Sequence, residues 1–321
     1  MMRFWVRFVV GLGFGSGLLW LALRDVDVRA VGAAMLAADS RYLAAGLALY
    51  WFDIGARIVR WRGLLRSTKL LRFPDVAQAL IVGYAVNNVL PARLGEIFRA
   101  DFLRRQFAVS RSAAVGSIIV ERLLDGIVVV CLFVLGLALV TFETGSEILV
   151  MAAAAGGAGV LMAAAAVATF PAYYRRLPFA TVPWIAPRLD AFVGALSVVR
   201  TRHFRIAAVW SVGIWAIESC AIACVTLACG VHLDAAALCV VVGAASLSTL
   251  LPSAPGYVGS LQIAYVAAFA ALGESPEAAV VAATLTQVAL LGSITVVGLG
   301  LLATAFLARP ANGVANSAAP K

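Results

Sequence analysis

The chain is poor in charged residues, in histidine and in cysteines spaced to bind a metal. Only 13% of its 321 residues are charged and two are histidine, whereas a soluble domain carries about 25% charged residues. A soluble protein is therefore excluded. We expect the cysteines to behave as small apolar residues, and we expect no metal site, because they lie in apolar runs without a Cys-x-x-Cys pair. They are Cys131, Cys220, Cys224, Cys229 and Cys239.

Long hydrophobic runs take the place of charge. The mean hydropathy is +0.98, and several runs reach the roughly 20 residues needed to cross about 30 Å of hydrocarbon. The fold class we predict is an all-α polytopic integral membrane protein. A long apolar core favours a retained first span over a cleaved signal peptide. Six segments are expected to cross fully: 5–23, 42–60, 117–142, 148–170, 206–228 and 278–307.

The charges that are present are unevenly placed along the chain. The net charge is +9, and basic residues collect in the connections 57–72 and 171–205, whereas 143–147 and 273–277 carry only acids. Because basic connections stay on the cytoplasmic side of a membrane, this pattern places both termini in the cytoplasm.

Two further apolar segments do not fit as full crossings. A crossing at 76–90 would export the basic stretch 93–111, against the charge rule. We therefore expect two re-entrant helical hairpins, at 76–111 and 236–273, with eight full transmembrane helices as the alternative. The hairpins share the spacing Leu-Pro-x-x-x-Gly, and their breaks lie at Pro91 and Gly95, and at Pro252, Pro255, Gly256 and Gly259.

The order span, hairpin, span occurs twice. It covers about 42–142 and about 206–307, and the charges invert the second copy relative to the first. Paired interrupted segments in two inverted halves indicate a transporter site near the middle of the membrane. We expect one transmembrane domain over 1–308 and a short polar cytoplasmic tail over 309–321.

Several charged residues fall inside the predicted membrane region. Asp53 and Arg57 are spaced i, i+4 and are expected to pair on one helix face, while Arg60 to Arg62 have the composition of an interfacial anchor. A helix restarting near 92–95 would favour an anion at its amino end, with Arg93 and Arg99 as donors. The alternative is an internal pair between Glu96 and Arg99.

Three charges in five residues mark the entry of the third span. Glu121 and Asp125 share a helix face and would pair with Arg93 or Arg99 around a cavity; the alternative is that they cap the span at the interface. Charges at this depth are by default functional. Glu218 stands alone in its span, so Asp53 and Glu218 are candidates for proton coupling, unless Glu218 stays neutral in a packed interface.

These motifs occur together in order. The run NxxLPARxGExxRAxxL, then ERLLD and LLPxxPGxxG, resembles the transmembrane flippase-like domain of the lysylphosphatidylglycerol synthase family, as a stand-alone member without the synthase domain. The resemblance implies a bacterial inner (plasma) membrane. Gln262 departs from the family pattern, in which an acid often follows the second break. The resemblance implies a substrate site at Asn88, Arg93, Glu96, Arg99, Glu121, Arg122 and Asp125.

Lipid translocation is the function we expect. The protein would move a polar, phosphate-bearing phospholipid or isoprenoid-linked lipid between leaflets, without ATP because the chain has no Walker A motif. We expect no enzyme activity, no cofactor and no nucleic-acid partner. Expected partners are anionic or lipid-linked polar lipids, lipid-biosynthesis enzymes and a second copy of the chain. Two alternatives stay open: an intramembrane enzyme acting on a lipid headgroup, and a scaffold of a lipid- or hopanoid-synthesis complex that uses the GxxxG spacing of the first span.

Overall fold

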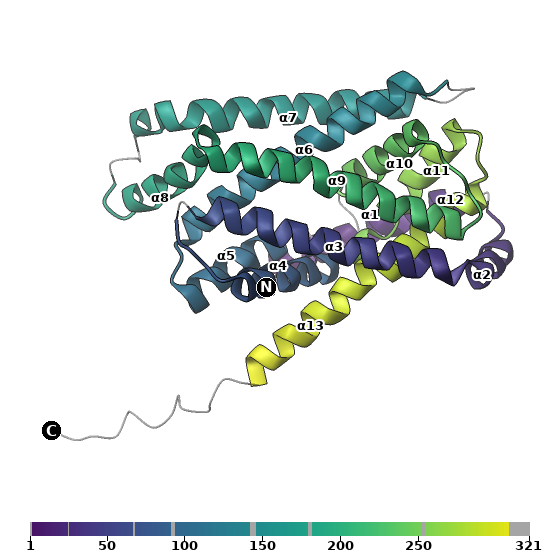
Figure 1. Ribbon diagram of the computed structural model, residues 1–321, viewed down its shortest axis with the longest axis horizontal. Helices are drawn as coiled ribbons and strands as arrows, with labels where there is room; N and C mark the ends of the chain where they lie inside the picture. The colour runs from purple at the N-terminus through teal and green to yellow at the C-terminus, as the bar shows by residue number, and fades with distance from the viewer. Residues whose placement is uncertain are drawn as a thin grey trace.

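The computed structural model describes residues 2–24, 26–66, 68–90, 94–141, 146–178, 182–251 and 254–307. In these residues every regular element is a helix (Figure 1), so the prediction of an all-α polytopic membrane protein is confirmed. The α-helices are α1 (Met2–Leu23), α2 (Val28–Ala37), α3 (Ser40–Leu65), α4 (Phe73–Val89), α5 (Leu94–Phe107), α6 (Arg111–Leu139), α7 (Glu147–Tyr173), α8 (Ala186–Leu196), α9 (Arg202–Ala228), α10 (Ala235–Ser248), α11 (Ser260–Ala271), α12 (Pro276–Leu285) and α13 (Gly292–Leu307).

Four helical stretches are long and apolar enough to cross a membrane. They are Ser40–Leu65, Glu147–Arg176, Arg202–Ala228 and Pro276–Thr304, and each coincides with a predicted crossing. The last stretch is interrupted, because the π-helical segment Thr286–Leu291 joins α12 to α13. The two other predicted crossings fall on α1 and on α6, a helix of 29 residues that carries three charges near its middle.

The two predicted hairpins are pairs of short helices. α4 and α5 contain 17 and 14 residues, and α10 and α11 contain 14 and 12, all shorter than the roughly 20 residues of a full crossing. α4 and α5 run antiparallel, because Asn87 and Gly83 of α4 face Gly95 and Arg99 of α5. As described, α5 begins at Leu94, within the restart expected near 92–95; Pro91 and Arg93 lie outside the described residues.

The helices of the two predicted repeats pack in equivalent ways. α3 and α9 lie side by side and antiparallel (Figure 1), with the amide of Asp39 donating to the carbonyl of Ala228 at 3.0 Å. α4 packs along α13, and α10 packs along α6. In the two repeats α4 corresponds to α10, and α6 corresponds to α12 and α13. The contact of α4 with α13 is therefore equivalent to the contact of α10 with α6, as a two-fold repeat predicts.

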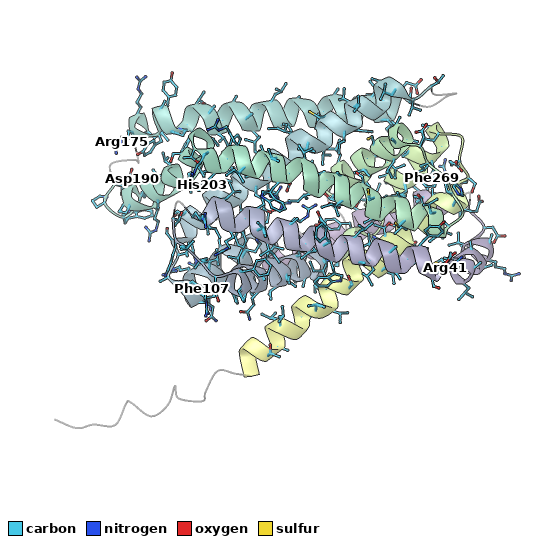
Figure 2. All side chains as sticks on the ribbon, viewed as in Figure 1. Arg41, Phe107, Arg175, Asp190, His203 and Phe269 are labelled. Carbon is cyan, nitrogen blue, oxygen red and sulfur yellow. The ribbon has the colours of Figure 1, made fainter. Side chains whose placement is uncertain are left out.

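The two basic connections, 57–72 and 171–205, lie at the same end of the helix bundle. Figure 2 shows Arg175, His203 and Phe107 toward that end and Arg41 and Phe269 toward the other. The Nζ of Lys69 donates to the carbonyl of Phe107 at 2.6 Å, so the connection 57–72 also belongs to the first end. The placement agrees with the charge rule used for topology.

One glycine of the first span, Gly15, packs closely within the chain. A Cβ on Gly15 would stand 2.4 Å from the amide nitrogen of Ala254, at the second hairpin break, whereas Gly13 and Gly17 meet nothing within 4 Å. Small residues allow such close approach between helices. Two short helices, α2 and α8, lie in connections where no helix was expected, and two of the free cysteines, Cys131 and Cys220, are exposed.

Candidate functional site

The predicted pair of Asp53 and Arg57 forms inside the bundle. Arg57 Nε donates to Asp53 Oδ2 at 2.6 Å, and its guanidinium also pairs with Glu218 on α9. Asp53 is fully buried, so the carboxylate needs this partner in order to remain charged. Glu218, the one charged residue in its predicted span, shares this arginine of α3 with Asp53.

Arg60 is part of the core, so its interpretation as an interfacial anchor was wrong. It is 1% exposed and forms a two-point ion pair with Asp125 on α6, with Nη2 at 3.1 Å from Oδ2. Its Nη1 also donates to Ser211 Oγ at 2.8 Å, and Trp215 Nε1 donates to Asp125 at 3.2 Å. The reason is that α9 packs along this face of α3 and buries it.

Arg99 holds the first hairpin to α6 through Glu121. The guanidinium donates to both carboxylate oxygens, at 2.8 and 3.3 Å, and lies 3.8 Å above the ring of Trp61. Such two-point and stacked contacts are typical of arginine. The side chain crosses α4 at Gly83, where a Cβ would stand 2.2 Å from Arg99 Cγ.

Arg122 lies at the rim of the cluster. It donates to Glu121, lies within 3.4 Å of the Tyr84 hydroxyl, and its Nε is 3.5 Å from Glu96 Oε1. The side chains of Arg122 and Glu96 are 32% and 26% exposed. Glu96 therefore pairs with Arg122, not with Arg99 as the alternative from the sequence proposed.

These pairs form one continuous charged cluster. It runs from Glu96 through Arg122, Glu121, Arg60, Asp125 and Arg57 to Glu218, with Arg99 and Asp53 as side branches. The cluster joins α5, α6 and α3 of the first repeat to α9 of the second. Its ends are partly exposed and its middle is buried. Because buried ion pairs contribute little net stability, stability alone does not explain this cluster.

Some buried atoms in the cluster keep hydrogen-bonding capacity. Asp53 Oδ1 and the Nε atoms of Arg60, Arg99 and Arg122 make no hydrogen bond within the described residues. Buried polar atoms are normally bonded to protein or water. These four atoms therefore keep hydrogen-bonding capacity that the protein contacts of the cluster do not use.

Asn88 lies away from the charged cluster. Its Nδ2 donates to the carbonyl of Leu291 at 3.2 Å and to Thr295 Oγ1 at 2.9 Å. The neighbouring Asn87 accepts from the amide of Gly95 at 2.7 Å, so the chain itself bonds one of the helix-start amides that were expected to hold an anion. Arg93, the other predicted donor, lies outside the described residues.

The second hairpin break contributes no charge. Gly256 and Gly259 have positive φ angles of 70° and 87°, a conformation that glycine adopts without steric cost. Pro255 begins a short 3-10 turn there, and Pro252 lies outside the described residues. Gln262 caps the start of α11 by accepting from the amide of Gly259 at 2.8 Å.

Several residues that contact the charged cluster were missed from sequence. On α9, Ser211 and Trp215 precede the predicted Glu218 at spacings of four and three residues, which places all three on one helix face. That polar stripe was a signal that could have paired α9 with α3. Trp61 and Tyr84, which flank Arg99 at 3.8 and 5.8 Å, carried no such signal.

The site has no metal-binding arrangement among the described residues. The carboxylates of Glu121 and Asp125 both face arginines, which compete with a cation for their oxygens. In the Asp25-Val26-Asp27 stretch, Asp27 accepts from the amide of Arg29 at 2.8 Å and caps α2; Asp25 lies outside the described residues.

A protein-family model and one known protein match nearly the whole chain. A family model described as "Lysylphosphatidylglycerol synthase TM region" matches residues 8–310. Glycosyltransferase AglD of Haloferax volcanii is 27% identical over 91% of this chain and 53% of its own length. UPF0104 membrane protein PH1989 of Pyrococcus horikoshii is 26% identical over 42% of this chain and 40% of its own length. The chain thus spans about half the length of the curated relatives it matches.

Proposed function

The chain belongs to the lysylphosphatidylglycerol synthase transmembrane-region family, and we propose that it moves a phosphate-bearing polar lipid between the leaflets of its membrane. The observation that carries the proposal is the charged cluster, which continues from Glu96 to Glu218 through the buried middle of the bundle. Charges at this depth mark substrate or ion pathways, and hydrocarbon tails of the lipid would stay outside the protein.

Entry of the headgroup is proposed at Arg122 and Glu96. Their ion pair, at 3.5 Å, is longer than the 2.8 Å contact between Arg99 and Glu121, and both its side chains are partly exposed. A phosphate approaching Arg122 can therefore displace Glu96 toward solvent. Arginine is suited to this exchange because its planar donors bind phosphate at two points.

Passage beyond the rim would use the hydrogen-bonding capacity of the inner arginines. Arg99 and Arg60 both contact Glu121, at 2.8 and 3.7 Å, so a phosphate leaving Arg122 meets the next guanidinium while Glu121 remains paired. At the far end, Glu218 and Asp53 share Arg57. We propose this shared pair as the proton-coupling site, because protonating one carboxylate leaves the other to neutralise the arginine.

The proposal is tested by lipid movement in reconstituted vesicles. Purified protein is placed in vesicles of phosphatidylglycerol and phosphatidylethanolamine that contain an acyl-labelled fluorescent phosphatidylglycerol, and dithionite reports the outer-leaflet fraction with time. Arg122→Ala is expected to slow translocation about tenfold, the scale of losing one charged hydrogen bond. Arg105→Ala is the matched control, because this arginine is 63% exposed and pairs with Asp101 outside the cluster.

Equal translocation rates for Arg122→Ala and the wild type would show that the charged cluster does not lie on the lipid pathway. Co-purifying lipid provides a second readout: mass spectrometry of the wild type should show one polar lipid enriched over bulk membrane, and Arg99→Ala with Arg122→Ala should lose it. Bulk lipid alone in both samples would favour the scaffold alternative, with lipid-biosynthesis enzymes as partners. A homo-oligomer remains a separate proposal, tested by mass in nanodiscs.

We propose that the protein resides in a bacterial inner membrane with both termini in the cytoplasm. The end that carries Arg175, His203 and Phe107 would then face the cytoplasm (Figure 2). A membrane-impermeant thiol reagent applied to right-side-out vesicles should label a cysteine placed at Glu274 and not one placed at Arg188. The reverse labelling would invert the topology.

An enzyme acting on a lipid headgroup is the second candidate. A relative named a glycosyltransferase, similar over 91% of this chain, favours keeping it, although the chain corresponds to about half of that protein. Incubation of the purified protein with total membrane lipid, followed by mass spectrometry, separates the candidates. A chemically altered lipid would favour the enzyme, and an unaltered lipid that changes leaflet would favour the translocator.

A further inference from the structure

An uncharged polar cluster lies where the second hairpin break meets the last span. Gln287 is in the π-helical segment Thr286–Leu291; its Nε2 donates to the carbonyl of Gly256 at 2.9 Å, and its Oε1 accepts from Gln262 Nε2 at 2.5 Å. Gln262 in turn accepts from the amide of Gly259 at 2.8 Å. One amide bridge therefore holds both sides of the turn 256–259.

The first hairpin contacts the same π-helical segment. Asn88 donates to the carbonyl of Leu291, the last residue of the segment, at 3.2 Å. Its own carbonyl is 3.9 Å from the position that a Cβ on Gly256 would occupy. The tips of the two hairpins therefore meet each other, and they contact opposite ends of one π-helical segment.

The π-helical segment and the turn 256–259, which the amide bridge joins, both have unusual backbone conformations. The segment closes with a bond from the amide of Gly292 to the carbonyl of Gln287, five residues earlier. Such segments are rare and frequently occur at functional sites. In the turn, Tyr257 has a φ of 61° although it is not glycine. Conformations of this kind persist where surrounding contacts impose them, so loss of the bridge should release both.

We propose that Gln287 is a positioning residue that latches the second hairpin tip to the last span, and that lipid translocation requires it to release Gly256. The inference rests on the proposed translocation. A neutral bridge is suited to this role because a headgroup hydroxyl or phosphate can replace its hydrogen bonds. The ion pairs of the charged cluster are less suited, since opening one leaves an unpaired buried charge.

Hydrogen exchange of the purified full chain in lipid nanodiscs tests the latch directly. Gln287→Met keeps the length of the side chain and removes both hydrogen bonds. Peptides that cover 254–262 are expected to exchange about fivefold to tenfold faster than in the wild type, the scale of losing one or two such bonds. The matched control is Gln106→Met, because Gln106 is exposed on α5. If Gln287→Met does not fold, Gln262→Met removes the bond between the two amides from the hairpin side and leaves the bond from Gln287 to Gly256, so a smaller rise in exchange is expected.

The gating role is tested by the vesicle measurement with fluorescent phosphatidylglycerol. An opened latch should raise the translocation rate severalfold in Gln287→Met and leave Gln106→Met at the wild-type rate. Unchanged exchange at 254–262 overturns the latch, and faster exchange with an unchanged translocation rate overturns its gating role. Both conclusions hold only where the wild-type protein moves lipid in the same vesicles. A wild type that moves none overturns the proposed function and the gate together.

Discussion

Arg99 on α5 and Glu121 on α6 are joined by two hydrogen bonds, at 2.8 and 3.3 Å, and neither side chain has exposed surface. The pair ties the first hairpin to a long helix at the centre of the bundle. Arg60 approaches the same carboxylate at 3.7 Å and Arg122 donates to it. Glu121 therefore faces three arginines; Arg60 and Arg122 have further carboxylate partners, and among the described residues Arg99 pairs with Glu121 alone.

Glu121→Gln should destabilise the fold strongly. The amide keeps the shape of the side chain but leaves the buried Arg99 without its carboxylate partner, and breaking a buried ion pair costs about 3–5 kcal/mol. The thermal midpoint in nanodiscs measures the loss. Glu147→Gln is the control, because Glu147 is exposed at the start of α7. Equal midpoints for the two variants would show that Arg99 does not depend on the charge of Glu121.

Gly83→Ala should displace Arg99 from Glu121. A Cβ there would stand 2.2 Å from Arg99 Cγ and 3.3 Å from the carbonyl of Gly95, and overpacking of this kind costs about 1–3 kcal/mol. In contrast, Gly55→Ala on α3 meets nothing within 4 Å, so it should be neutral or stabilising by up to about 1 kcal/mol.

Thermal midpoints and lipid translocation should both fall for Gly83→Ala and not for Gly55→Ala. The same result for both variants would mean that Arg99 has another route across α4.

Arg60 and Asp125 should show strong coupling in a double-mutant cycle. Arg60→Met leaves Asp125 with fewer partners in a buried position, and Asp125→Leu leaves Arg60 without its two-point carboxylate. Removing both charges avoids an unpaired one, so the double variant should lose less stability than the sum of the single variants by about 1–3 kcal/mol. Additive losses in denaturant unfolding would show that the pair is not coupled.

Gly259→Ala should separate α1 from the second hairpin. Its Cβ would stand 2.0 Å from the carbonyl oxygen of Gly15, and its φ of 87° is unfavourable for alanine. Gly273→Ala shares the positive φ, at 76°, but meets nothing within 4 Å. The control thus isolates the backbone strain, about 1–2 kcal/mol. Proteolysis of the α1 region should accelerate in Gly259→Ala alone; equal protection would show that this contact does not hold α1.

Part of the charged cluster was readable from sequence because its partners are local. Asp53 and Arg57 lie one helical turn apart, and Glu121 and Asp125 share a face, so helical geometry is enough to place each pair. The partner of Arg60 was not readable, because an arginine at the end of a predicted span has the pattern of an interfacial anchor. Only the packing of α9 on α3 shows that this face is buried.

The hydrogen bonds between Gln287 and the second hairpin were even harder to predict from the sequence. The π-helical segment lies inside a run, 278–307, that is uniformly apolar apart from a few small polar residues and Gln287. Composition predicts a single uninterrupted span there. The backbone departs from the α-helix at the place where Asn88 and Gln287 connect it to the hairpin tips, and these contacts join residues about 30 and 200 positions apart in the chain.

The sequence by itself determined that the chain is a polytopic membrane protein, where its main spans and hairpins lie, and which end carries the basic connections, because hydropathy, Pro and Gly breaks and charge act locally along the chain. The tertiary structure decided which arginine faces which carboxylate and where the two hairpin tips meet. Those choices depend on how α3, α6 and α9 pack, and the attraction between two buried charges acts through space, whatever their separation in sequence.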